Sequence, residues 1–540
     1  MKPEQPVEQP LSLNMNPYSG TWDKAAAAHL LRRTMFGATN QQILQAVSNG
    51  MDATVASLLQ IPPVDLPLTY DPNEGIATIG TTWINSVYPT DASGSLATET
   101  ARVKSLGAWM MKRLNAQTLS IAEKMCLFWQ NHFAATATSD SRATYMYHML
   151  IRNHALGNFK QLIKDMTIDP TMLIFLNGAT NFNFSPNENY ARELLELYTV
   201  GKGPQISLGD YTNYTEQDVA AGAKILTGWT VLGLRSDSIA TPYVQFFPTA
   251  HENSDKTLSY HFNNTVIPNA DENEYANYID VIFQQDAVAY FISKEIYRYF
   301  VNYDLTSDVT TNVIPVMAQT FIDNNYEILP VMDLLLKSEH FYDLSLRGSL
   351  IRSPLEMVFG MFNATSSGPN FDLSTDSDMY LSLYWMAETM GQAYATPPSV
   401  AGWTAYYQAP SFSKLWVNAT HIKTRFDISS YLTILTGIPV NGNFLKLNAL
   451  GFLSGLSNPG NSTAVISDMC EVFCPKPINA VQQATLKAIL INGVGATAEG
   501  AWTQQYSQYI GGDTTLASAI NNRVQLTLSR LFKMPEFQTI

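Results

Sequence analysis

Charged residues are scarce in this sequence. Only 14% of its 540 residues are Asp, Glu, Lys or Arg, and 32 basic against 46 acidic residues give a net charge of −14. A negative net charge repels phosphate backbones, and no basic stripe along the chain offsets it, which argues against nucleic acid as a partner. With 46% hydrophobic residues, the chain nevertheless has the composition of a protein with a large packed core.

Cysteine is scarcer still, with three residues in the chain. That number is too small for a disulfide framework. Cys126 lies in an apolar helical run and is predicted to be a buried thiol. Cys470 and Cys474 stand four residues apart before Pro475, and two unbridged thiols at a helix end are favoured over a strained disulfide. A zinc half-site there lacks its other ligands, so neither a metal nor a cofactor is predicted.

Long apolar runs are also missing. No window of about 18 apolar residues exists, so no membrane span is predicted. Residues 1–20 lack the charged-then-apolar pattern of a signal peptide. Their Pro, Glu and Gln content predicts a flexible N-terminal tether, which is typical of a chain whose export signal or lipid anchor has been removed. The alternative is an intracellular protein.

Helix-starting signals, in contrast, are abundant. Apolar residues recur at intervals of three and four, and a capping residue is repeatedly followed by Glu or Gln three positions later. Such starts lie at Thr39–Gln42, Ser120–Glu123, Ser185–Glu188 and Ser353–Glu356. The predicted fold is mainly α, a large multi-helix globular array with a small β-hairpin insert near 230–265. Residues 21–540 are predicted to form a single large helical domain, with 21–270 and 271–540 as candidate sub-lobes.

The segment 185–201, SPNENYARELLELYTVG, carries the most chemistry. On one continuous helix, Asn189, Glu193 and Glu196 share a stripe beside an apolar stripe that faces the core. Carboxylates in such a position either pair with arginines or serve as ligands or acid/base groups. Ion pairing with Arg192, or with arginines brought close by the fold, is the structural alternative.

His132, in FWQNHF, lies beside aromatic residues on the helix that begins near Ser120. A single histidine in such a place is a hydrogen-bonded core residue more often than a catalyst. If it meets Glu193 or Glu196 in space, a general acid/base site becomes available, so these three residues are the catalytic candidates. No His-Glu-x-x-His motif or other metal-ligand spacing accompanies them.

A further set of charged and aromatic residues are candidate binding positions. They are Arg33, Arg192, Tyr211, Asp218, Trp229, His251, Lys256 and Trp403. Structural alternatives apply to several of them. Asp218 in the first turn of a helix complements the helix dipole, and 251–256 reads as a solvated polar turn. Trp403 and its aromatic neighbours either stack on a sugar or peptide or pack over the helical core.

Four segments in order carry a family resemblance: HLLRRTMFGAT, FWQNHF, NENYARELLELYTVG and YTEQDVAAGAKILTGW. With them the chain resembles the bacterial domain-of-unknown-function family 1800, from about Ala25 to the C-terminus. The resemblance implies an exported protein of Bacteroidota, planctomycetes or other bacteria, often encoded beside a partner of sulfatase-like fold. It implies no activity. His132, Glu193, Glu196 and the binding candidates from Arg33 to Lys256 fall on motif positions of the family.

Two functions from different classes remain open. The favoured one is an exported or cell-envelope protein with a binding or assembly role, with a glycan or peptide ligand or a protein partner of sulfatase-like fold. The alternative is a hydrolase-like enzyme that acts on extracellular polysaccharide or peptide through His132 with Glu193 or Glu196. Convergence of these groups in one pocket, with a carboxylate free of arginine, would distinguish the two. Both place the protein in the periplasm, at the cell surface or outside the cell.

Overall fold

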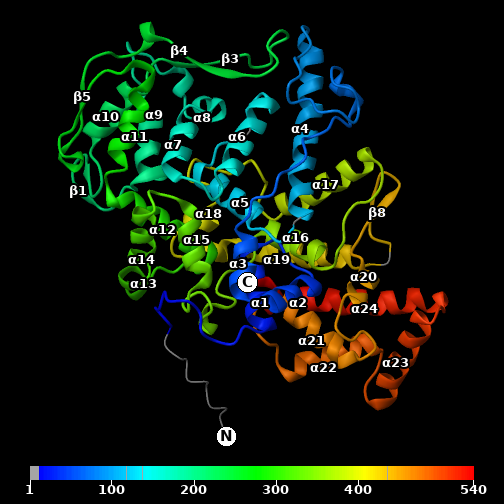
Figure 1. Ribbon diagram of the computed structural model, residues 1–540. Helices are drawn as coiled ribbons and strands as arrows, with labels where there is room; N and C mark the ends of the chain where they lie inside the picture. Colours follow the sequence, from blue (N-terminus) through cyan, green and yellow to red (C-terminus); the bar gives the residue numbers. More distant parts are fainter. Residues whose placement is uncertain (1–10, 117, 137, 435) are drawn as a thin grey trace.

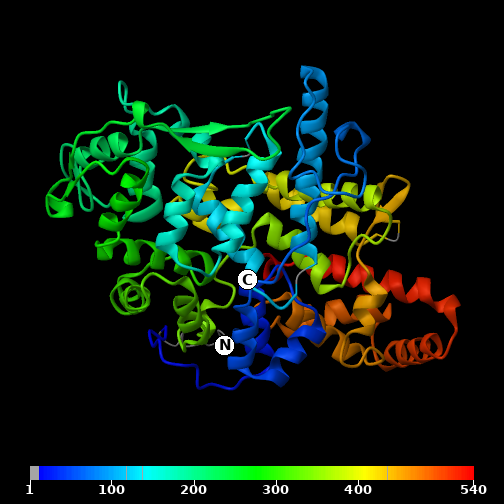
Figure 2. The same ribbon diagram turned by 45° about the horizontal axis from the view of Figure 1, so that its top comes forward.

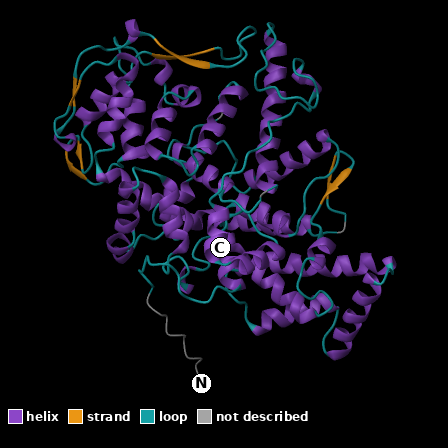
Figure 3. Cartoon of the chain, in the orientation of Figure 1, coloured by secondary structure: helices purple, strands orange, loops and turns teal. Residues whose placement is uncertain are grey.

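Helices make up most of the chain (Figure 1, Figure 3). The computed structural model describes residues 11–116, 118–136, 138–434 and 436–540. Within these ranges, strands occur only as four separate two-stranded antiparallel pairs. The predicted mainly α fold class is therefore confirmed.

The first half of the chain contributes eleven of the described α-helices. They are α1 (Lys24–Thr34), α2 (Asn40–Asn49), α3 (Met51–Leu58), α4 (Ala92–Asn115), α5 (Ala122–Phe133), α6 (Ser141–Asn153), α7 (Phe159–Thr167), α8 (Pro170–Phe175), α9 (Glu188–Glu193), α10 (Glu216–Ile225) and α11 (Glu274–Ile282). A π-helix, Leu194–Thr199, directly continues α9.

The second half is also helical. Its α-helices are α12 (Asp286–Phe300), α13 (Ser307–Asn312), α14 (Ile314–Asp323), α15 (Ile328–Lys337), α16 (Pro354–Ala364), α17 (Leu373–Glu388), α18 (Thr404–Tyr407), α19 (Ala419–Leu432), α20 (Ala449–Ser454), α21 (Ser462–Phe473), α22 (Ala480–Ile491), α23 (Ala496–Ile510) and α24 (Ala517–Phe532). Short 3₁₀ turns lie between helices along the whole chain. They are Pro72–Glu74, Gly178–Thr180, Pro248–Ala250, Tyr260–Phe262, Asp271–Asn273, Leu344–Leu346, Phe412–Trp416, Thr514–Leu516 and Pro535–Gln538.

The predicted β-hairpin insert is confirmed. Strand β3 (Trp229–Leu232) pairs antiparallel with β4 (Tyr243–Phe246), and β5 (Lys256–Thr257) pairs with β6 (Val266–Ile267). Two further pairs were not predicted. They are β1 (Gln205–Ser207) with β2 (Asp210–Tyr211), and β7 (Ile438–Val440) with β8 (Asn443–Leu445).

Two predicted helix starts form complete capping boxes. Thr39 caps α2 together with Gln42, and Ser353 caps α16 together with Glu356. In each case both orphan backbone donors at the helix start are satisfied by side chains a few residues away. Because all of the partners are local, the sequence pattern alone was sufficient to identify them.

The other two predicted starts differ in the structure. Asn187, rather than Ser185, caps α9. Ser120 accepts a hydrogen bond from the backbone N of Ala122 at 3.1 Å, but no capping box forms there. The side chain of Glu123, the expected box partner, instead meets two arginines from other helices. Glu123 and these two arginines line the same pocket.

One hydrophobic cluster runs through the molecule from Met15 to Phe537. Helices α21 to α24 gather at one end, and α9 to α11 lie at the other with the sheets of β1 to β6, whereas β7 and β8 lie beside α17 (Figure 1, Figure 2). α4 packs along α17 and α16, which joins the two candidate sub-lobes. The buried ion pair of Lys124 with Glu356 joins them again. No described helix combines the length and apolar character that crossing a membrane requires.

The start of the chain was predicted to be a flexible tether over residues 1–20. Residues 1–10 lie outside the described part of the chain. Residues 14–18 run along residues 337–340 and are joined to them by backbone hydrogen bonds of 2.7–2.9 Å. The described part of the expected tether is thus held against the end of α15.

Candidate functional site

The segment with the two candidate catalytic carboxylates is not one continuous α-helix. α9 ends at Glu193 and the chain continues as the π-helix Leu194–Thr199. There the hydroxyl of Thr199 donates to the carbonyl O of Leu194, five residues back, at 2.5 Å. A π-turn is wider than an α-turn, so Glu196 no longer follows Glu193 in the predicted α-helical stripe.

The two carboxylates have different surroundings. Glu196 accepts a hydrogen bond from the Tyr214 hydroxyl at 2.8 Å and lies 3.2 Å from Nζ of Lys202. Glu193 is half-buried and makes no hydrogen bond or ion pair within the described residues. Burial and the neighbouring charge of Glu196 raise the pKa of Glu193.

His132 is a core residue. Its Nε2 lies 3.1 Å from the carbonyl O of Tyr198, and aromatic rings including Phe128 and Phe159 surround the imidazole. Burial lowers the pKa of His132 to about 4. Nowhere in the described chain does a hydrogen bond or ion pair join His132 to Glu193 or Glu196, so the structure does not assemble the predicted acid/base site.

Arg192 and Tyr211 do come together, around a carboxylate that the sequence analysis did not select. The guanidinium group of Arg192 lies 2.7 Å from Glu216 and 3.1 Å from Glu188. The Tyr211 hydroxyl donates to Glu216 at 3.2 Å. These groups are partly exposed, and exposed ion pairs stabilise a fold little. Arg192 is therefore an ion-pairing residue, in agreement with the structural alternative.

His251 and Lys256 were predicted as binding positions, with a solvated turn as the alternative, and the structure places them in no solvated turn. Both are about 2% exposed. His251 Nε2 lies 3.0 Å from Glu274, and Lys256 Nζ lies 2.7 Å from the second oxygen of the same carboxylate. Nearby, the buried Asp218 accepts hydrogen bonds from the backbone N and the hydroxyl of Ser259, at 2.7 and 2.6 Å. These residues fasten the segment after β4 to α10 and α11, and the sequence analysis missed both Glu274 and Ser259.

The remaining candidates, Arg33, Trp229 and Trp403, belong to the core. Arg33 is 2% exposed and donates to the carbonyl O of Leu346 at 2.6 Å. Trp229 and Trp403 are 8% and 2% exposed. Trp416, expected beside Trp403 in a stacking surface, is buried as well. Trp403 therefore packs over the helical core and does not form a stacking surface.

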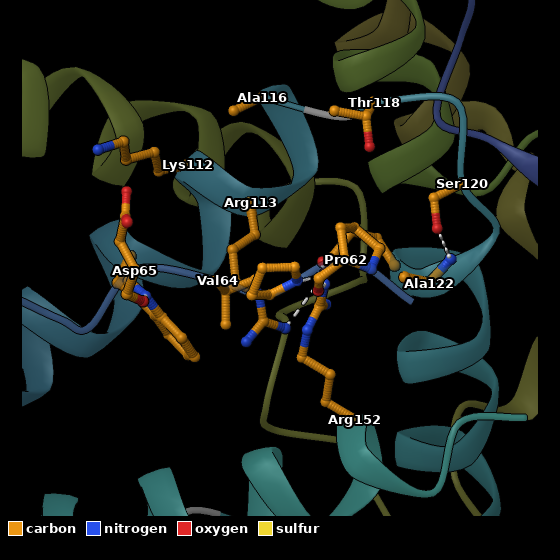
Figure 4. Close-up of a pocket in the computed structure, with 13 residues that line it drawn as sticks. Pro62, Val64, Asp65, Lys112, Arg113, Ala116, Thr118, Ser120, Ala122 and Arg152 are labelled. Atoms are coloured by element: carbon orange, nitrogen blue, oxygen red, sulfur yellow. Dashed lines mark hydrogen bonds and ion pairs between the residues drawn. The ribbon is translucent and has the colours of Figure 1, made fainter. Parts of the chain in front are cut away.

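A pocket of about 200 Å³ lies where α4 ends and α5 begins (Figure 4). The loop 62–65 forms one wall, and the end of α6 contributes Arg152. In Figure 4 the side chains of Arg113 and Arg152 converge beside Pro62 and Val64. Lys112 and Asp65 stand at an exposed edge of the pocket.

Glu123 holds the two arginines together. Nε of Arg113 donates to Glu123 at 3.2 Å, and Arg152 pairs with the other carboxylate oxygen. Arg152 also donates to the carbonyl O of Pro62 at 2.8 Å, which fixes the wall of the pocket. The guanidinium carbon of Arg113 lies 4.2 Å from the centre of the Trp109 ring, within cation–π distance.

The positive charge of this pocket is not fully matched. Lys112, Arg113 and Arg152 carry three positive charges, against the two negative charges of Asp65 and Glu123. Nη1 of Arg113 is buried and makes no hydrogen bond within the described residues. A buried polar group without a partner is costly, so the guanidinium group of Arg113 keeps an unused hydrogen-bond donor beside the pocket. No group of three or more His, Cys, Asp or Glu side chains in the described chain is arranged to hold a metal ion.

One protein-family model matches the chain. The model of the family described as "Protein of unknown function (DUF1800)" matches residues 29–539, which is nearly the whole chain. The chain belongs to the DUF1800 family. The DUF1800 match includes every residue that lines the pocket around Arg113. Searches of curated proteins and of solved structures returned no match.

Proposed function

We propose that this DUF1800 protein is a binding protein for an acidic ligand, whose anionic group enters the pocket between Arg113 and Arg152. The observation that carries the proposal is that Arg113 and Arg152 both line the pocket, while Nη1 of Arg113 is buried without a hydrogen-bond partner. Guanidinium groups bind carboxylates and sulfates through paired N–H donors, and desolvation strengthens such bonds. The existing bond of Nε to Glu123 orients the guanidinium group.

The size and the walls of the pocket restrict the ligand. At about 200 Å³, the pocket is smaller than the roughly 300–1,000 Å³ typical of drug-sized ligands. It therefore suits one sugar or amino-acid residue rather than a chain segment. Asp65 and Thr118 are exposed at its edge and offer hydrogen-bond partners for hydroxyl groups, while Pro62 and Val64 form an apolar wall. A uronic acid at the end of a glycan has this combination of groups.

The location and the partner complete the proposal. We propose that the ligand lies outside the cytoplasm, where acidic glycans are displayed, and that a protein of sulfatase-like fold is the partner in an envelope assembly. The support for both is the family affiliation together with the low charge of the chain.

Calorimetric titration with galacturonic acid tests the binding proposal, with galactose as the uncharged comparison. We expect galacturonic acid to bind and galactose to bind at least tenfold more weakly. Lys112→Met should weaken binding about fivefold, the equivalent of about 1 kcal/mol for one partly exposed charge. Lys104→Met is the matched control, because Lys104 lies two turns earlier on α4 and pairs with Asp71 outside the pocket. Equal binding of both sugars, or no binding of either, would overturn the proposal for uronic acids.

The hydrolase alternative retains one supporting observation, the unpaired and half-buried carboxyl group of Glu193 with its raised pKa. A raised pKa suits a general acid. However, the proposed partner His132 is bound to a backbone carbonyl and is buried. The structure thus offers one of the two groups that the acid/base mechanism needs, and binding is the function that its geometry supports better.

A further inference from the structure

Two thiols lie together at the end of the molecule that α21 to α24 form. Cys470 is in the last turn of α21, and Cys474 is the residue that ends this helix. Both are free, and both line a second pocket of about 180 Å³. Arg32 of α1 and Arg347 form part of the wall of the same pocket.

The backbone allows the two sulfur atoms to bond. The backbone N of Cys474 donates to the carbonyl O of Cys470 at 2.8 Å, which is the last hydrogen bond of the helix. Residues four apart in a helix are separated by about 6 Å along its axis, within the roughly 4.4–6.8 Å range of Cα distances in disulfides. Cys474 has an extended backbone (φ −107°, ψ 135°), so its side chain is not held in the helical direction.

Two buried arginines surround Cys474. Arg32 donates to the carbonyl O of Glu471 at 2.8 Å, and Arg352 donates to that of Phe473 at 2.7 Å. The exposed carbonyl groups at a helix C-terminus would disfavour a thiolate, and these guanidinium groups offset them. Neither arginine has an ion-pair partner within 4.0 Å in the described chain, and Nε of Arg32 is buried without a hydrogen bond.

The groups near the two thiols shift the pKa values of these thiols in opposite directions. The S–H of Cys470 as a hydrogen-bond donor, together with Arg32 and Arg352, lowers the pKa of Cys474, while burial and the carboxylate of Glu536 oppose this change. The pKa of Cys470 is raised. One thiol of the pair is therefore favoured as the thiolate and the other as the proton donor, which is the asymmetry of an attacking and a resolving cysteine.

We propose that Cys474 and Cys470 form a thiol–disulfide exchange site for small anionic disulfides. The Cys474 thiolate attacks one sulfur of a disulfide R–S–S–R, forming Cys474–S–S–R and releasing R–S⁻. Cys470 then loses its proton and attacks Cys474 Sγ, forming the Cys470–Cys474 disulfide and releasing the second R–S⁻. The protein loses two electrons and two thiol protons, and the small disulfide gains the electrons.

The cationic side chains of the pocket determine the class of disulfide. Lys476 is exposed at the pocket, and Arg347 is half-buried with an unpartnered Nε. Glu471 also lines the pocket, but Lys24 pairs with it at 2.7 Å. Carboxylate-bearing disulfides such as oxidised glutathione are thus favoured over neutral ones.

The test uses the full reduced chain with oxidised glutathione, followed by acid quenching and peptide mass spectrometry. We expect wild type to acquire the Cys470–Cys474 disulfide without retained glutathione. Cys470→Ser should retain one glutathionyl group on Cys474, whereas Cys474→Ser should react at Cys470 at least tenfold more slowly. Cys126 is the internal control, because burial raises its pKa to about 11 and it lies in neither pocket.

The arginines give a second readout. In the Cys470→Ser background, Arg32→Met should slow glutathionylation of Cys474 about tenfold, while Arg523→Met, a change at a distant arginine, should leave the rate unchanged. Equal rates at Cys470 and Cys474 in the two single serine variants, or a Cys474 no faster than Cys126, would overturn the proposal. If Arg32→Met does not fold, the comparison of the serine variants alone decides.

Discussion

The guanidinium group of Arg113 is stacked on the indole ring of Trp109, with 4.2 Å between the guanidinium carbon and the ring centre. The indole is fixed in turn, because its N–H donates to the carbonyl O of Asp65 at 2.6 Å. Arg113 is thus held on one side by a ring and on another by Glu123, and its Nη1 makes no hydrogen bond within the described residues. A preorganised donor of this kind binds an anion without first losing side-chain freedom.

Replacing Arg113 with lysine separates charge from geometry. Arg113→Lys keeps the positive charge but removes the planar fork, so we expect the affinity for galacturonic acid to fall at least tenfold in calorimetric titration. The unfolding free energy should fall by about 1 kcal/mol, because the cation–π contact is weakened. Arg523→Lys is the matched control, since Arg523 lies over the Trp502 ring at 5.2 Å outside the pocket. A variant that binds like wild type would remove Arg113 from the site.

Glu123 is predicted to be the most sensitive carboxylate of the pocket. Glu123→Gln leaves two buried arginines without a counter-ion, which should cost about 3 kcal/mol of unfolding free energy in urea denaturation. Glu216→Gln is the control, because it removes a carboxylate from the partly exposed Arg192 pair. There the loss should stay below about 1 kcal/mol. Similar losses at the two positions would contradict the difference in burial that we describe.

The pH dependence of stability should carry a contribution from Asp169. This residue caps α8 from a buried position, and burial raises its pKa to about 7 from 3.8. Between these values the folded state binds more protons than the unfolded state, so stability falls as pH rises from about 4 to 7 and levels off above. Asp169→Asn keeps the acceptor for the backbone N of Thr171. Above pH 7 it should be more stable than wild type by about 4 kcal/mol, at 1.36 kcal/mol per pKa unit.

His132 should lower the stability of the folded protein at acid pH. Its pKa is lowered to about 4 from 6.5, so the unfolded state binds more protons between these values and stability is lost as pH falls from 6.5 to 4. We expect His132→Gln to abolish this part of the acid loss, about 3 kcal/mol at 1.36 kcal/mol per pKa unit. Urea denaturation of both proteins at several pH values measures the difference. A constant difference between variant and wild type from pH 4 to 7 would show that the imidazole is not desolvated.

Glu193 decides between the two functions. Glu193→Gln removes a half-buried charge that has no partner, so the melting temperature should stay the same or rise slightly. Glu196→Gln weakens the bond to Tyr214 and the ion pair with Lys202, so it should lower the melting temperature. If the Glu193→Gln strain behaves like a deletion strain while the variant protein keeps its fold, the hydrolase alternative is favoured. An unchanged phenotype is the outcome expected for a binding protein.

The sequence predicted those features whose partners are close along the chain. The capping boxes at Thr39 and Ser353 and the hairpin of β3 with β4 involve residues within about twenty positions, and all were predicted. Helix periodicity likewise predicted the mainly α fold. The π-helix after Glu193 was not predicted, because its hydrogen-bond pattern does not follow from the spacing of apolar residues.

The site itself required the tertiary structure. Glu123 looked like half of a capping box, and only the meeting of α4 and α6 shows that its partners are Arg113 and Arg152. For the same reason, the sequence did not predict that His251 and Lys256 both pair with Glu274, which lies on a later helix. Charges spaced along a chain predict a site only when the helices that carry them are known to converge.

The pocket around Glu123 is built from residues 62–152 alone, less than a fifth of the chain. A stretch this short can be exchanged as one cassette between relatives that share its partners elsewhere in the fold, namely α17, against which α4 packs, and Glu356, which pairs with Lys124. Chimaeras that swap only this cassette should therefore transfer the ligand preference of the donor protein. The thiol pair of Cys470 and Cys474 would remain that of the recipient protein.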